Sequence, residues 1–152
     1  MNNFLKKIPL KIATLGPIGY LKASGTVASL CSLIAIALLN FSQCNYSLFT
    51  FVITALSFVV LRLAPLDLVH NDAGELVIDE VVGTVVTFLF IPLTPARLIV
   101  GFVLFRFFDI SKSFGVDYIQ RLPGTYGVLS DDIAAGLLSN MVLQGLLYYA
   151  FI

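Results

Sequence analysis

The stretch Ser47–Leu63 reads Ser-Leu-Phe-Thr-Phe-Val-Ile-Thr-Ala-Leu-Ser-Phe-Val-Val-Leu-Arg-Leu and is apolar except for one charge, Arg62, next to its end. As an α-helix it would be about 25 Å long, close to the roughly 30 Å thickness of a bilayer's hydrocarbon core. Because backbone groups in lipid must be hydrogen-bonded within the protein, we expect helices. Four other apolar stretches flank it: Thr26–Phe41, Val77–Leu93, Pro95–Ile110 and Asp132–Ile152. The pattern predicts an all-α polytopic membrane bundle of about five apolar helices.

The composition supports a membrane protein. Hydrophobic residues make up 59% of the 152 residues and charged residues 12%, against about 25% charged residues in soluble domains. A chain of this size has too little interior to hide so much apolar surface from water. We expect a single membrane-embedded domain over residues 1–152, with residues 1–24 as a cytoplasmic or interfacial N-terminal segment. Cys31 and Cys44 have no metal-ligand spacing and are predicted to be small buried residues.

The charged residues gather on one side of the membrane if five helices alternate in direction. On this topology all acidic residues lie on the side of the N-terminus, and Arg97 is the one basic residue on the other side. Lys and Arg concentrate on the cytoplasmic side of membranes, so we expect the charged side to face the cytoplasm. The net charge is zero, which gives no basic surplus for binding nucleic acid.

Three groups of acidic residues lie at predicted helix ends. Asp79 and Glu80 open the third apolar stretch, Asp109 closes the fourth, and Asp131 and Asp132 open the fifth. Carboxylates next to apolar sequence are costly unless they are paired or bind a cation, and a divalent ion such as Mg²⁺ takes oxygen ligands of this kind. Helix capping is the alternative for Asp131 and Asp79. It does not explain Asp109, because a negative charge is unfavourable at a helix C-terminus.

Two basic residues accompany these acids. Arg106 and Asp109 are three residues apart, on one helical face, and Lys112 continues that face if the helix runs on. They form either an intrahelical ion pair, with Lys112 extended toward the interface, or a clamp for a phosphate group.

Two glycine-containing segments precede apolar helices, Ser24-Gly25-Thr26 and Gly124–Gly127. Their backbone amides either bind an anion at a helix start or form simple tight turns, and Thr26 and Gly127 are the candidate phosphate-binding positions. The lone His70 is predicted to be a surface-loop residue. No second histidine and no Ser-Gly-His element are present, so a covalent intermediate on histidine is disfavoured.

Four blocks of the sequence together resemble the phosphatidylglycerophosphatase A family. They are Ser24-Gly-Thr-Val-Ala-Ser-Leu30, Val77-Ile-Asp-Glu-Val-Val-Gly83, Phe105-Arg-Phe-Phe-Asp-Ile-Ser-Lys112 and Gly127-Val-Leu-Ser-Asp-Asp-Ile-Ala-Ala-Gly136, in the order of the family. Some positions differ: the family usually has proline at Ser24, Lys-Pro followed by an aromatic-Pro-Ile run at Lys112–Val116, and paired glycines at Gly124-Thr125. The acidic positions and Lys112 are retained.

The resemblance implies a Mg²⁺-dependent phosphatase of the bacterial cytoplasmic (inner) membrane. Its substrate would be the phospholipid phosphatidylglycerophosphate, and its products phosphatidylglycerol and inorganic phosphate. By position, the family's acidic metal-binding and catalytic residues correspond to Asp79, Glu80, Asp109, Asp131 and Asp132. Its basic residues correspond to Arg106 and Lys112, which are expected to bind the substrate phosphate. A small ion-coupled membrane transporter that uses the acids for cations is the alternative, but transporters hold such charges near the bilayer midplane.

Overall fold

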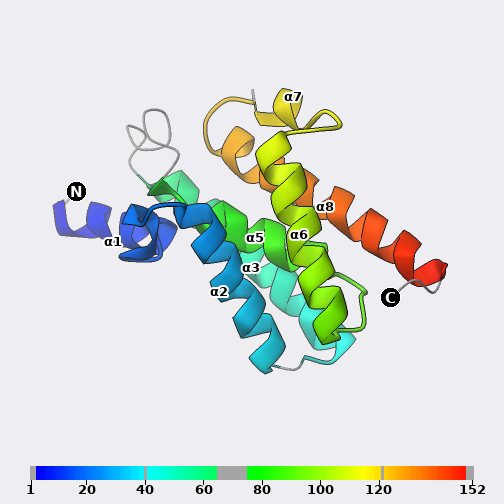
Figure 1. Cartoon of the computed structure of the whole chain (residues 1–152). Helices are drawn as coiled ribbons and strands as arrows, with labels where there is room; N and C mark the ends of the chain where they lie inside the picture. The colour runs from blue at the N-terminus through cyan, green and yellow to red at the C-terminus, as the bar shows by residue number, and fades with distance from the viewer. Residues whose placement is uncertain (1–2, 40, 65–74, 121, 150–152) are drawn as a thin grey trace.

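The computed structural model of the chain describes residues 3–39, 41–64, 75–120 and 122–149, and every regular element in these ranges is helical (Figure 1). The all-α prediction is confirmed for this part of the chain, and the predicted loop around His70 lies outside it. The elements in chain order are α1 (Asn3–Ala13), the 3-10 turn η1 (Ile18–Tyr20), α2 (Ser24–Leu39), α3 (Gln43–Leu63), α5 (Ile78–Thr87), α6 (Pro95–Ser111), α7 (Val116–Gln120) and α8 (Thr125–Tyr148).

Local sequence sets where α3 and α6 begin. The Ser42 hydroxyl accepts a hydrogen bond from the backbone N–H of Asn45 (3.4 Å) at the start of α3. Thr94 does the same for α6, accepting from the N–H of Arg97 (3.4 Å). Pro95 follows in the first turn, where its missing N–H costs nothing. The predicted helix start at Pro95 is confirmed.

Helix α5 lies in the middle of the bundle, in contact with α2, α3, α6 and α8 (Figure 1). Every residue of α5 except Glu80 and Val81 is buried. Its buried valines belong to two apolar clusters, which also contain Leu61 of α3 and Leu143 of α8. A helix that is apolar on most sides belongs in the interior, so the first turn of α5 holds its carboxylates inside the protein.

The predicted helix over Val77–Leu93 is wrong in its second half, because α5 ends at Thr87. Pro92 disfavours helical backbone at the residue before it, and Phe90 has a positive φ of 60°. A helix as short as α5 is about 15 Å long, half the thickness of the hydrocarbon core. It is therefore too short to cross a membrane alone.

Side chains from other helices satisfy the backbone carbonyls around the end of α5. Asn140 of α8 donates from Nδ2 to the carbonyl oxygens of Thr87 (2.9 Å) and Leu89 (2.7 Å). The Tyr46 hydroxyl of α3 donates to the carbonyl of Val85 (2.8 Å). A helix that stops inside an apolar bundle needs such partners, because no water is there to replace them.

Only α3 among the described helices is long and apolar enough to cross a membrane, and α2 is a shorter apolar helix. Helix α8 has the length, but it carries Asp131, Asp132, Asn140 and Gln144. The prediction of about five spanning helices is therefore not confirmed. The prediction for the cysteines is wrong, since both Cys31 and Cys44 are exposed.

The N-terminal segment 1–24 contains α1 and η1 and leads into α2. The backbone N–H of Val77 donates to the carbonyl of Ala13 (3.0 Å), which joins the end of α1 to the start of α5. Gly19 in η1 has no room for a side chain, because a Cβ there would collide with the backbone carbonyl oxygen of Glu75, just before α5. These contacts fix the α5 end that carries Asp79 and Glu80.

Candidate active site

A close crossing of α5 and α8 brings their carboxylates together. A Cβ on Gly136 of α8 would lie 2.5 Å from the carbonyl oxygen of Gly83 of α5, and a Cβ on Gly83 would lie 2.8 Å from the carbonyl oxygen of Asp132. Small residues allow two helix backbones to approach this closely. Gly83 follows Asp79 by four residues and Gly136 follows Asp132 by four. The crossing therefore places the two aspartates one turn away on the same side.

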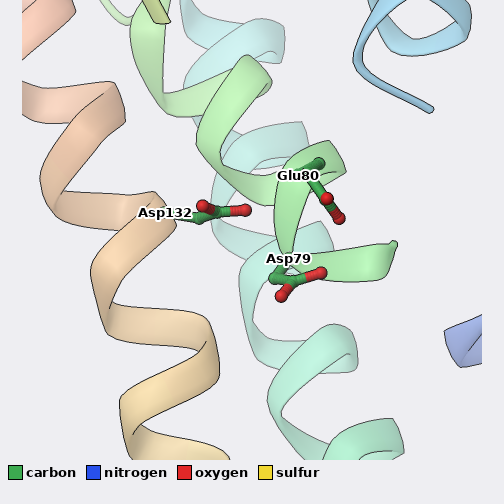
Figure 2. A group of neighbouring side chains, drawn as sticks. All are labelled: Asp79, Glu80 and Asp132. Carbon is green, nitrogen blue, oxygen red and sulfur yellow. The ribbon is translucent and has the colours of Figure 1, made fainter. Parts of the chain in front are cut away.

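Asp79, Glu80 and Asp132 form the group that we call the carboxylate cluster. Each offers an oxygen, and these oxygens all lie within 4.8 Å of one another. Figure 2 shows Asp132 pointing from α8 toward the first turn of α5, where Asp79 and Glu80 lie. Asp79 is 8% exposed and Asp132 is 3% exposed. Oδ1 of Asp79 and Oε2 of Glu80 are buried and have no hydrogen-bond partner among the described residues.

The other two predicted acids, Asp109 and Asp131, are joined by Lys112. The Lys112 ammonium donates to Oδ1 of Asp109 (2.9 Å) and to Oδ2 of Asp131 (2.8 Å). The remaining oxygens are also used: Oδ2 of Asp109 accepts from Arg106 (2.7 Å), and Oδ1 of Asp131 accepts from the backbone N–H of Asp132 (3.0 Å). These two acids therefore have partners, in contrast to the carboxylate cluster.

Burial lowers the pKa of the Lys112 ammonium, but the bonds to Asp131 and Asp109 outweigh it and hold that pKa above its ordinary value. Lys112 stands in a left-handed conformation (φ 49°) directly after α6, which turns its side chain back toward α8. It is therefore a charged link between the end of α6 and the second turn of α8.

Arg106 lies beside the cluster with part of its guanidinium group unused. Its Nη1 donates to Asp109 (2.7 Å) and to the Ser29 hydroxyl of α2 (3.4 Å). Its Nε is buried without a hydrogen-bond partner in the described structure. A buried unpaired donor is costly, so this N–H suits an anionic ligand.

The first turns of α2 form one wall of the site. The Glu80 side chain packs against Gly25, where any Cβ would collide with the carboxylate. Thr26 is half-buried in the same turn, and Gly127 is buried in the first turn of α8. No described side-chain hydrogen bond or ion pair links Thr26 to the cluster, and the phosphate-binding role of Thr26 and Gly127 stays a prediction.

The capping alternative for Asp131 is wrong, because α8 begins at Thr125 and Asp131 lies in its second turn. Of the glycine-containing segment Gly124–Gly127, the residues from Thr125 onward belong to the first turn of α8. Four small residues that shape the site were not predicted as site residues: Gly25, Ser29, Gly83 and Gly136. The four-residue spacing of Asp79 to Gly83 and of Asp132 to Gly136 is the signal in the sequence that points to the last two.

The chain matches known proteins over most of its length. The family described as phosphatidylglycerophosphatase A matches residues 11–147. A protein of that name from Haemophilus influenzae is 31% identical over a gapped alignment of 162 positions, which covers 97% of each chain. Another from Escherichia coli is 33% identical over 85 residues, 55% of this chain and 47% of its own. A Bacteroides thetaiotaomicron protein provisionally named phosphatidylinositol-3-phosphatase is 36% identical over 48% of each chain. No solved structure matches the chain.

The matched region contains the carboxylate cluster, Arg106 and the Lys112 link. All three relatives carry the names of phosphatases, and none supports the alternative of an ion-coupled transporter. The chain belongs to the phosphatidylglycerophosphatase A family and is a phosphatase.

Proposed function

We propose that the protein hydrolyses phosphatidylglycerophosphate to phosphatidylglycerol and inorganic phosphate, with Mg²⁺ held by Asp79, Glu80 and Asp132. The observation that carries this proposal is the carboxylate cluster, with its buried, unpaired oxygens next to the free N–H of Arg106. The substrate is the one named for the Haemophilus influenzae relative, which matches the chain nearly end to end.

The residues of the cluster fit Mg²⁺ by their chemistry. They offer carboxylate oxygens, which are the hard ligands that Mg²⁺ prefers. Three carboxylates this close repel one another when ionised. In the described structure neither Arg106 nor Lys112 forms an ion pair with any of them. A divalent cation removes that repulsion and gives Oδ1 of Asp79 and Oε2 of Glu80 the partner they lack.

The chain's own side chains then divide the work of hydrolysis. A bound Mg²⁺ would supply Lewis-acid polarisation of the phosphoryl oxygens. Arg106 donates hydrogen bonds to the phosphate and offsets its growing negative charge. A cluster carboxylate orients the attacking water and accepts its proton. As the water oxygen bonds to phosphorus, the bond from phosphorus to the glycerol oxygen breaks, and the proton passes to that oxygen to give the hydroxyl group of phosphatidylglycerol. Lys112 fixes Asp109 and Asp131 between α6 and α8, which keeps the two sides of the site in register.

The surface of the bundle supports a membrane location for this reaction. Helix α6 exposes Ile99, Val103, Phe107 and Ile110, which recur at helical spacing along one face. Large apolar side chains are exposed along α2, α3 and α8 as well, including Leu38, Phe51 and Met141. An apolar surface this extensive suits a lipid environment. We propose that the bundle is embedded in the cytoplasmic membrane, with the cluster at its cytoplasmic side and the substrate's acyl chains in the bilayer.

The proposal is tested with the purified full chain in detergent micelles that contain phosphatidylglycerophosphate. We expect release of inorganic phosphate, loss of release in EDTA, and recovery when Mg²⁺ is restored. Asp79→Asn, Glu80→Gln and Asp132→Asn should each lower kcat/KM by about 100-fold or more. Asp117→Asn on α7 is the matched control, because it makes the same change outside the carboxylate cluster and should keep the wild-type rate.

Two results would contradict the proposal. Full activity in EDTA would show that the reaction needs no divalent metal. A wild-type rate in Asp132→Asn would show that Asp132 of α8 is not part of the active site. Phosphatidylinositol 3-phosphate is the comparison substrate, because the Bacteroides thetaiotaomicron relative is named as a phosphatidylinositol-3-phosphatase. Faster phosphate release from phosphatidylinositol 3-phosphate than from phosphatidylglycerophosphate would show that the proposed headgroup is wrong, while the proposed phosphatase chemistry would stand.

A further inference from the structure

Ser29 of α2 is fully buried, and its hydroxyl makes two hydrogen bonds. Oγ donates to the backbone carbonyl of Gly25 (2.8 Å), and it accepts from Nη1 of Arg106 (3.4 Å). A serine hydroxyl has one proton and two lone pairs. Since the proton is used by Gly25, the oxygen is oriented as an acceptor toward Arg106.

The partners of Arg106 lie on one side of its guanidinium group. Both bonds described for it leave from Nη1, one to Asp109 and the other to Ser29. The Nε–H is buried and unpaired. Nε and Nη2 form one edge of the planar guanidinium group, and such an edge matches two phosphate oxygens at once. The two Nη1 bonds thus leave this edge for a ligand.

We propose that Ser29 is a positioning residue, which holds Arg106 so that its Nε and Nη2 edge faces the substrate phosphate. The inference rests on the proposed function, in which Arg106 binds that phosphate. Asp109 alone fixes one hydrogen of Nη1 and leaves the guanidinium plane free to rotate about that bond. The second acceptor, on another helix, sets the plane.

The chain provides a matched control for the competing explanation that Ser29 matters only for helix packing. Ser32, three residues later on α2, donates to the carbonyl of Ala28 (2.8 Å) and is 9% exposed. It makes the same backbone hydrogen bond as Ser29, but no hydrogen bond to Arg106 is described. Ser29→Ala and Ser32→Ala therefore remove the same local interaction, and only the first removes the acceptor for Arg106.

The experiment compares kcat and KM for release of phosphate from phosphatidylglycerophosphate. Ser29→Ala should raise KM and lower kcat/KM by about fivefold to tenfold, the factor expected for one hydrogen bond. The inhibition constant for inorganic phosphate should rise by a similar factor. Ser32→Ala should stay within about twofold of the wild type in both measurements. Thermal unfolding of both variants in detergent checks that they fold alike.

A double-mutant cycle with Arg106→Gln gives the decisive readout. If Ser29 acts through Arg106, then Ser29→Ala has no further effect on KM in the Arg106→Gln background. The inference is overturned if Ser29→Ala matches Ser32→Ala, or if it lowers kcat/KM by the same factor with and without Arg106. A wild-type KM in Arg106→Gln alone would instead overturn the phosphate-binding role of Arg106 in the proposed function.

Discussion

Gly136→Ala should damage both stability and activity, because it adds a methyl group at the close crossing of α5 and α8. The new Cβ would lie 2.5 Å from the carbonyl oxygen of Gly83, which is 0.9 Å inside the 3.4 Å at which ordinary contact begins. The neighbour is backbone, so the two helices must separate. Overpacking of this kind costs about 1–3 kcal/mol, while replacing glycine in a helix returns about 0.5–1 kcal/mol.

The difference is a net loss of up to about 2.5 kcal/mol, which should lower the Tm by up to about 10 °C for a chain of this size. The shift also moves Asp132 away from Asp79, and a displacement near 1 Å can reduce a rate by about 100-fold. Gly145→Ala is the control on the same helix, because no atom lies within 4 Å of its added Cβ. Thermal unfolding in detergent and phosphate release measure both effects. If Gly136→Ala kept the wild-type rate and had a Tm as high as that of Gly145→Ala, the close crossing would not be what assembles the cluster.

Two more substitutions test other parts of the site. The three atoms nearest to the Cβ added in Gly25→Ala all belong to the flexible Glu80 side chain, so the Tm should stay near the wild-type value while the Mg²⁺ concentration for half-maximal activity rises. An unchanged Mg²⁺ requirement would show that Gly25 does not position Glu80. Lys112→Met leaves Asp109 and Asp131 without their shared cation and should destabilise the protein by about 1–3 kcal/mol, since the Lys112 side chain is only 26% exposed. The folded-state pKa of Lys112 is raised, so its contribution is fully present below the ordinary lysine pKa of about 10.4 and is lost only as the pH rises through the raised value. The Tm difference between the wild type and Lys112→Met should therefore be constant from pH 7 to 9, and a difference that shrinks within this range would contradict the ion-pair assignment.

The helix class and several helix bounds could be predicted because their signals are local. Thr94 and Pro95 mark the start of α6 within a few residues of sequence. The end of α5 was missed, although Pro92 is a local signal against continued helix. The apolar run to Leu93 outweighed it, since hydropathy does not distinguish a helix from a buried extended segment. Asn140 donates a hydrogen bond to the backbone carbonyl of Thr87 at the end of α5. This residue lies on a different helix, so no local sequence pattern reveals the contact.

The acidic positions of the site could be predicted, but their division into two groups could not. Charge and apolar neighbours make Asp79, Asp109 and Asp132 look alike in the sequence. Their partners depend on where Lys112 points, and this follows from a left-handed residue at the end of α6 and from the distance between α6 and α8. Small residues such as Ser29 and Gly25 carry no charge signal, so their contacts with Arg106 and Glu80 appear only in the assembled bundle.

The sharing of charge is why we propose a cation on one side of the site rather than across all of it. Five acidic and two basic side chains meet where α5, α6 and α8 approach one another. In the described residues Arg106 pairs with Asp109, and Lys112 pairs with both Asp109 and Asp131. Spreading the two bases over all five acids would leave each carboxylate weakly compensated. The observed arrangement compensates Asp109 and Asp131 and leaves Asp79, Glu80 and Asp132 without a paired positive charge among the described residues. Buried like charges at this spacing raise the free energy of the folded protein, and the proposed divalent ion would turn that cost into metal affinity.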